Sequence, residues 1–260
     1  MCGIVGYIGG DQAAPILLSG LQKLEYRGYD SAGVAVYNDG GLRVVKSKGR
    51  LSVLEGILEG GVTLPGTVGI GHTRWATHGA PSDINSHPQV SDGGKFAVVH
   101  NGIIENYLYL KNHLIRRGVE FVSETDTEVV AQMLEHYYQG DVLEAIRKVI
   151  SKVEGSYALG IICADCPEKL FAVRKDSPLI IGVGEGENYI ASDVPAILSR
   201  TRDIYRLKDQ EIAVLTREGV SFYDQELEPI TKEMERVQWD VAAAEKGGYE
   251  HFMMKEICEQ

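Results

Sequence analysis

The chain has 260 residues, 44% of them hydrophobic and 24% charged, with a formal net charge of −11. This composition is typical of a soluble globular protein. The negative charge argues against a general affinity for nucleic acid or for acidic membranes. No apolar run is long enough to span a bilayer, and no signal peptide is visible. Four cysteines without a secretion signal indicate a reducing, cytoplasmic setting rather than a disulfide framework.

The first half of the sequence predicts a mixture of strands and helices. Residues 2–9 form a glycine-rich apolar segment typical of a buried strand, and Ala14-Pro15 opens a helix, because proline fits the first helical turn. The hydrophobic spacing after these elements predicts further strands at 32–37, 42–46, 68–72 and 96–100, and helices at 52–58 and 104–117.

The second half begins with two helices and then changes to strands. Thr125-Asp126-Thr127-Glu128 matches the capping-box pattern and places Asp126 in the first turn of a helix. A helix at 141–153 follows, and then strands at 157–164, 169–174, 179–183, 188–191, 204–207 and 211–216, with a short helix at 194–199. Helices and strands are therefore grouped rather than alternating, which predicts an α+β layered domain with antiparallel sheets.

Cys2 is the first candidate for chemistry. Cysteine is small enough for Met1 to be removed in front of it, which would leave a thiol and a free α-amine on one residue. Their unperturbed pKa values, ~8.5 and ~7.7–8.0, pair a nucleophile with a base near neutral pH. The alternative is a small apolar residue that opens a strand.

Polar residues gather where two of the predicted strands end. Arg74 lies in the loop 72–79 and can bind a carboxylate through two parallel hydrogen bonds; the alternative is a structural salt bridge beside a packed Trp75. Asn101-Gly102 offers a side-chain amide and a main-chain N–H, the composition of an oxyanion hole. The alternative there is a tight turn, for which Asn-Gly is a common dipeptide.

Asp126 also has two interpretations: it can bind a substrate ammonium group, or it can be a capping-box carboxylate that only stabilises the helix through its dipole.

No metal or cofactor is expected. Cys163-Ala164-Asp165-Cys166 is a single CxxC without a second pair, and the histidines do not have the HExxH spacing. The glycine-rich segment 182–187 lacks the lysine of a phosphate loop and is better read as a hairpin turn.

Taken together, the motifs resemble a known family. The segments that carry the resemblance occur in this order: Cys2-Gly3-Ile4-Val5-Gly6, Arg27-Gly28-Tyr29-Asp30-Ser31-Ala32-Gly33, His72-Thr73-Arg74-Trp75-Ala76-Thr77-His78-Gly79, His100-Asn101-Gly102-Ile103-Ile104-Glu105-Asn106 and Ser123-Glu124-Thr125-Asp126-Thr127-Glu128. They closely resemble the glutaminase domains of glutamine–fructose-6-phosphate aminotransferases, over essentially the whole chain. The resemblance implies an N-terminal-nucleophile hydrolase fold, a four-layer α-β-β-α sandwich of two antiparallel sheets.

The resemblance also implies a role for each matching residue. Cys2 corresponds to the nucleophile, with its own amine as the proton relay, and Asn101 and Gly102 to the oxyanion hole. Arg74 and Asp126 correspond to the groups that hold the α-carboxylate and α-ammonium of glutamine. The remaining matches are Thr77 and His78 in the loop that closes over glutamine, Trp75 as the gate on the ammonia path, and Arg27 and Gly28 in the turn that supports the thiol.

The implied reaction is hydrolysis of L-glutamine to glutamate and ammonia through a cysteine thioester. In the full enzyme the ammonia would pass to fructose 6-phosphate in an isomerase domain to give glucosamine 6-phosphate, and the full-length enzyme is expected to be a homodimer. Residues 1–240 are expected to form the glutaminase domain. Residues 241–260 are expected to form a linker and the truncated start of the isomerase half.

Two alternatives remain open, and a third is disfavoured by the position of Cys2. The glutaminase domain of an amidophosphoribosyltransferase shares the fold and the nucleophile, although Tyr29 and the segment 249–260 favour the sugar enzyme. A non-catalytic glutamine-binding regulatory domain could keep the fold without turnover. A papain-type cysteine–histidine hydrolase would need its cysteine inside the chain rather than at residue 2.

Overall fold

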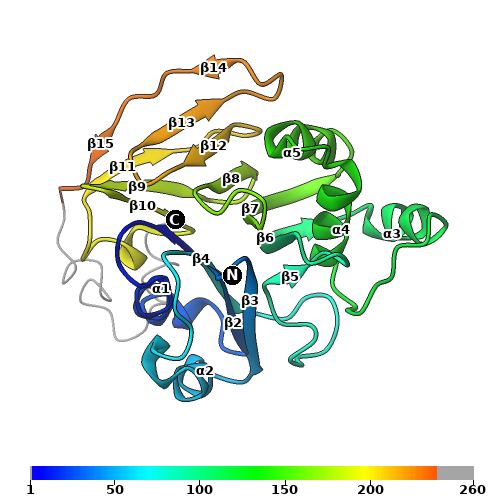
Figure 1. The fold of residues 1–260 in the computed structure, drawn as a ribbon, viewed down its shortest axis with the longest axis horizontal. Coiled ribbons are helices and arrows are strands. Elements are labelled where there is room, and N and C mark those ends of the chain that lie inside the picture. The colour runs from blue at the N-terminus through cyan, green and yellow to red at the C-terminus, as the bar shows by residue number, and fades with distance from the viewer. Residues whose placement is uncertain (1, 239–260) are drawn as a thin grey trace, which may run out of the picture.

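The computed structural model describes residues 2–238 and contains two antiparallel sheets packed face to face (Figure 1). The first sheet has the strand order β15-β11-β9-β10-β1-β4-β2-β3. Its strands are β1 (Gly3–Ile8), β2 (Ser31–Asn38), β3 (Gly41–Lys48), β4 (Val68–Arg74), β9 (Ile180–Gly184), β10 (Glu187–Ala191), β11 (Asp203–Arg206) and β15 (Glu235–Arg236).

The second sheet has the order β14-β13-β12-β8-β7-β6-β5. Its strands are β5 (Gln89–Val90), β6 (Phe96–Ile104), β7 (Gly155–Cys163), β8 (Leu170–Lys175), β12 (Ile212–Leu215), β13 (Val220–Tyr223) and β14 (Pro229–Ile230). The longest pairing joins β6 to β7 in a register that runs from Phe96↔Cys163 to Ile104↔Gly155.

Helices cover the outer face of each sheet, which gives the expected order of layers, α-β-β-α (Figure 1). The first sheet packs against α1 (Ala13–Gln22) and α2 (Leu51–Ile57), and the second against α3 (Tyr107–Ile115), α4 (Thr127–Tyr137) and α5 (Val142–Ile150). Short 3₁₀ helices lie at η1 (Glu25–Arg27), η2 (Glu59–Gly61) and η3 (Val194–Ala196). The predicted fold class is confirmed.

Strand alternation explains why three apolar clusters form. In β1, Val5 and Tyr7 point to the helix layer, whereas Ile4 and Ile8 point into the space between the sheets. Side chains two residues apart share a face of a strand. The same alternation places Val68 and Ile70 of β4, and Ala97 and Val99 of β6, in the layer between the sheets.

That alternation also determines where the polar side chains at the strand ends lie. Continuing each inner face by steps of two leads to Cys2 before β1, to His72 and Arg74 at the end of β4, and to Asn101 in β6. All four positions are therefore directed to one end of the gap between the sheets.

Several element boundaries differ from the prediction. Strand β6 continues through Asn101-Gly102 to Ile104, so that α3 begins only at Tyr107, and the tight-turn reading of Asn-Gly is wrong. The short strands β5, β13, β14 and β15 were not predicted. Asp126 is the residue before α4 rather than in its first turn. The predicted linker 241–260 lies outside the described residues.

Candidate active site

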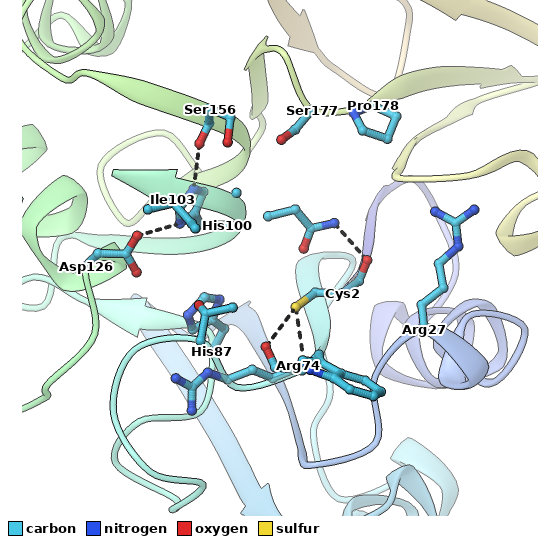
Figure 2. Close-up of a pocket in the computed structure, with 14 residues that line it drawn as sticks. Cys2, Arg27, Arg74, His87, His100, Ile103, Asp126, Ser156, Ser177 and Pro178 are labelled. Carbon is cyan, nitrogen blue, oxygen red and sulfur yellow. Dashed lines mark hydrogen bonds and ion pairs between the residues drawn. The ribbon is translucent and has the colours of Figure 1, made fainter. Parts of the chain in front are cut away.

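A cavity of about 380 Å³ opens at the end of the gap between the sheets. Its walls include most of the predicted site residues and several others (Figure 2). The lining residues are Cys2, Arg27, Arg74, Trp75, Thr77, His87, His100, Asn101, Gly102, Ile103, Asp126, Ser156, Ser177 and Pro178. Two predicted residues, Gly28 and His78, lie behind this wall rather than in it.

The Cys2 thiol lies on the cavity wall and is half-buried. The main-chain N–H of Trp75 donates to its Sγ at 3.1 Å, and Sγ lies 3.5 Å from the carbonyl oxygen of the same residue (Figure 2). Burial raises the pKa of the thiol, and the Trp75 hydrogen bond and the charge of Arg74 partly oppose this shift. A base must therefore take the thiol proton before Cys2 can act as a nucleophile at neutral pH.

Asn101 and Gly102 belong to strand β6 and line the same cavity as Cys2. The Asn101 side-chain Nδ2 donates to the carbonyl oxygen of Cys2 at 2.9 Å. Gly102 has φ +124°, and a Cβ there would lie 2.2 Å from the carbonyl oxygen of Ser156 on β7, so only glycine fits this position without a backbone shift. The main chain can thus pass close to β7 while the Asn101 side chain contacts Cys2 and Gly102 lines the same cavity.

Arg74 ends β4 and is 3% exposed, yet its guanidinium has no carboxylate within ion-pair distance among the described residues. Its Nη2 donates to the carbonyl oxygens of His78 and of Gly79, the latter at 3.2 Å. Its Nη1 has no hydrogen-bond partner in the described part of the chain. A buried cation with a free donor at a cavity wall is suited to bind a ligand carboxylate.

Asp126 presents the opposite charge to the same cavity and is 4% exposed. Its Oδ2 accepts a hydrogen bond from the Ile104 N–H at 2.8 Å and lies 3.9 Å from His100 Nδ1. Burial lowers the pKa of His100, so this imidazole is neutral at pH 7 and does not balance the carboxylate. No lysine or arginine within residues 2–238 pairs with Asp126, which leaves it free for an ammonium group.

Gly28 packs behind the peptide group that contacts the thiol, whereas Arg27 lies on the cavity wall. A Cβ on Gly28 would lie 2.8 Å from the Arg74 carbonyl carbon and 3.0 Å from the Trp75 nitrogen. Glycine therefore lets η1 pack against the peptide group that donates to Cys2 Sγ. Arg27 forms an ion pair with Asp193, and its Nε donates to the Tyr26 hydroxyl at 3.0 Å.

The loop after β4 holds the remaining predicted residues. Trp75 is 45% exposed and contacts the Tyr29 ring edge-on at 5.5 Å, while Thr77 is exposed on the cavity wall. The His78 ring packs edge-on against Tyr107 at 5.2 Å. Asp30, which was not predicted, holds this loop, because its Oδ2 accepts from the Ala76 N–H at 2.9 Å.

A family model described as a glutamine amidotransferase domain matches residues 72–199, the segment that contains Arg74, Asn101, Gly102 and Asp126. The whole chain is also 61% identical to a glutamine–fructose-6-phosphate aminotransferase (isomerizing) from Caldanaerobacter subterraneus subsp. tengcongensis, over 260 residues. The chain belongs to the glutamine amidotransferases. The resemblance seen in its motifs is thereby confirmed.

This glutamine amidotransferase has other relatives of the same kind. The protein of that name from Clostridium acetobutylicum is likewise 61% identical over the whole chain, and that from Aquifex aeolicus is 55% identical. The chain spans less than half the length of these relatives: 43% of the Caldanaerobacter and Clostridium acetobutylicum proteins and 44% of the Aquifex protein.

Solved structures support the fold of the amidotransferase. The glutamine phosphoribosylpyrophosphate amidotransferase from B. subtilis, complexed with ADP and GMP, superposes with a TM-score of 0.73 at 25% identity, covering 92% of this chain and 50% of that one. A glutamine aminotransferase class-II domain protein from Silicibacter pomeroyi has the same fold at 13% identity, with a TM-score of 0.61, covering 86% of this chain and 99% of that one.

Six residues of the cavity wall were not predicted: His87, His100, Ile103, Ser156, Ser177 and Pro178. His100 and Ile103 flank the predicted Asn101-Gly102, so the strand period could have indicated them. His87, Ser156, Ser177 and Pro178 reach the cavity from β7 and from connecting segments, and no local pattern marks them. No group of three or more His, Cys, Asp or Glu side chains within residues 2–238 could hold a metal ion, and no helix there could cross a membrane.

Proposed function

We propose that this chain hydrolyses L-glutamine to glutamate and ammonia at Cys2. The observation that carries the proposal is the pair of unbalanced buried charges, Arg74 and Asp126, in one cavity with a thiol. A free α-amino acid carries a carboxylate and an ammonium on one carbon, so it balances both groups at once. Binding through both charges selects an amino acid and directs its side chain elsewhere in the cavity.

The reaction starts once Met1 has been removed and the Cys2 nitrogen is a free amine. This amine takes the thiol proton, and the thiolate attacks the side-chain amide carbon of glutamine. The second hydrogen of Asn101 Nδ2 and the Gly102 N–H stabilise the resulting oxyanion, a contribution of about 2.7–4 kcal/mol for each donor in comparable sites.

The tetrahedral intermediate then collapses to a thioester, and water hydrolyses this thioester in a second step. The Cys2 ammonium returns the proton to the leaving nitrogen, the C–N bond breaks, and ammonia departs from a γ-glutamyl thioester. The free amine next takes a proton from a water molecule, which attacks the thioester carbon. The C–S bond breaks, glutamate leaves, and the thiol recovers its proton.

The test is glutamate release by the purified chain. We expect glutamate and ammonia in equal amounts. In Cys2→Ala the rate of glutamate release should fall by more than about 10⁴-fold, because the nucleophile itself is removed. The melting temperature of this variant should be unchanged. Binding of glutamine by calorimetry without release of glutamate would refute the proposal and support a non-catalytic regulatory domain.

We further propose that the ammonia serves amino-sugar synthesis in a longer protein. Residues 1–240 would form the glutaminase domain, and residues 241–260 would lead to an isomerase domain that holds fructose 6-phosphate. Support comes from the 61% identity to aminotransferases named for that acceptor, against 25% for the phosphoribosylpyrophosphate enzyme. Formation of glucosamine 6-phosphate by the full-length protein from glutamine and fructose 6-phosphate tests it, and formation of phosphoribosylamine instead would overturn it.

A further inference from the structure

His72 links the two sheets directly behind the proposed oxyanion hole. It lies on β4 of the first sheet, paired with Ile4 on β1, and is fully buried. Its Nε2 lies 3.0 Å from the Asn101 Oδ1 and 3.0 Å from the carbonyl oxygen of His100, both on β6 of the second sheet. Asn101 in turn donates to the Cys2 carbonyl oxygen. His72 therefore contacts the strand that carries the oxyanion donors from the sheet that carries the nucleophile.

The two oxygen neighbours determine which ring nitrogen of His72 carries the hydrogen. The His100 carbonyl oxygen can only accept, so Nε2 must be the donor. Nδ1 has no hydrogen-bond partner among the described residues, so a hydrogen placed there would be unsatisfied. Burial also lowers the pKa of His72 to about 3, which keeps the ring neutral at working pH. His72 is thus a neutral Nε2–H donor.

The same contacts determine the orientation of the Asn101 amide. Its oxygen faces the His72 N–H, and its nitrogen faces the Cys2 carbonyl oxygen. A flipped amide would set N–H against N–H and oxygen against oxygen. The amide nitrogen carries two hydrogens; one is used by Cys2, and the second remains for the cavity. We propose that His72 is a positioning residue that holds Asn101 with its N–H₂ toward the tetrahedral oxyanion.

This inference rests on the proposed glutaminase reaction and predicts a particular kinetic pattern. His72→Met removes the donor and should lower kcat for glutamate release by about 10²–10³-fold, the effect of losing one oxyanion donor. The KM for glutamine should change by less than about 3-fold, since His72 is not among the residues that line the cavity. His72→Gln keeps an N–H donor at nearly the same reach and should recover at least about 10-fold of the lost kcat.

A double-mutant cycle separates positioning from general damage. Asn101→Ala should lower kcat to a similar extent, and adding His72→Met to it should cost less than about 3-fold more, because both changes remove the same interaction. A loss in the double variant equal to the product of the two single losses would overturn the proposal. Unchanged kcat in His72→Met with an active wild-type chain would overturn it as well.

A measurement on the wild-type chain keeps the test independent of how the variants fold. In nitrogen NMR of the histidine-labelled protein, His72 should remain the neutral Nε2–H tautomer from pH 5 to 9. An Nδ1–H tautomer or a titrating imidazolium would refute the positioning role alone. A wild-type chain that releases no glutamate would refute the proposed function, and the positioning role with it, whatever the NMR shows.

Discussion

The main-chain N–H of Trp75 donates to the Sγ of Cys2 at 3.1 Å, although the two residues are 73 positions apart in sequence. The peptide group that makes this contact is packed from behind by Gly28, where a Cβ would lie 2.8 Å from the Arg74 carbonyl carbon. The position of the sulfur thus depends on a glycine that does not reach the cavity.

Gly28→Ala should therefore impair the reaction without unfolding the protein. The added methyl group must displace the Arg74–Trp75 peptide, and a displacement of about 1 Å near a reacting atom can cost about 10²-fold in rate. We expect kcat for glutamate release to fall by about 10–100-fold. Gly56→Ala in α2 is the matched control, because no atom lies within 4 Å of the added Cβ, and it should keep full activity. Equal activity in both variants would show that Gly28 does not position the thiol.

The two buried charged residues, Arg74 and Asp126, should contribute to the binding of glutamine. Arg74→Gln and Asp126→Asn each remove one charge that faces the cavity, which should weaken glutamine binding by about 2–5 kcal/mol, or roughly 30-fold or more. The KM for glutamine should rise accordingly, while the melting temperature of the ligand-free protein should not fall, because neither charge is balanced by an opposite one in the described structure. Unchanged KM in both variants would refute this assignment.

Gly102 is the position where the oxyanion strand is most sensitive to a side chain. It combines φ +124° with a Cβ position 2.2 Å from the Ser156 carbonyl oxygen. Gly102→Ala should lower the free energy of unfolding by several kcal/mol and abolish glutamate release. Gly118→Ala isolates the backbone effect, because it has φ +87° but no atom within 4 Å, and it should cost about 1 kcal/mol with activity kept. Similar losses in the two variants would contradict the close approach to β7.

Buried histidines should make the protein sensitive to acid. In the unfolded chain His72 binds a proton near pH ~6.5, but in the folded protein burial lowers its pKa to about 3. Below pH ~6.5 the unfolded state therefore binds more protons, and stability is lost as the pH falls toward 3. Burial also lowers the pKa values of His87 and His100, which act in the same direction.

For His72 alone the loss between pH 7 and pH 5 is about 2 kcal/mol. Urea unfolding at the two pH values measures it, and the exposed His113→Gln on α3 serves as a control that should show the same fall. A free energy of unfolding that is equal at pH 7 and pH 5 would mean that these imidazoles are protonated in the folded protein.

Sequence reasoning succeeded where a local pattern determines the structure. The apolar segments 2–9, 68–72 and 96–100 were predicted as strands and correspond to β1, β4 and the first part of β6. The alternation of side chains along these strands explains why Cys2, Arg74 and Asn101 share one cavity. The motif resemblance then indicated which of these polar residues to expect there. Eight of the ten predicted residues line the cavity, while Gly28 and His78 lie behind it.

The prediction failed where distant pairing overrides a local signal. Asn101-Gly102 has the composition of a turn, but nine residues of β6 pair with β7 and keep the dipeptide extended. His87 and Ser177 reach the cavity from segments without a periodic pattern, and the role of His72 depends on a contact between two sheets. The pattern of apolar and polar residues along one strand does not show which strand of the other sheet lies opposite it.

The central claim is that Cys2 becomes the reactive first residue, and a single sample can test it. Intact-mass analysis and glutamate release should be measured on the same purified chain. We predict a mass that lacks Met1, together with turnover of glutamine that falls in proportion to any fraction that retains it. Full turnover by a preparation in which Met1 is wholly retained would contradict the account.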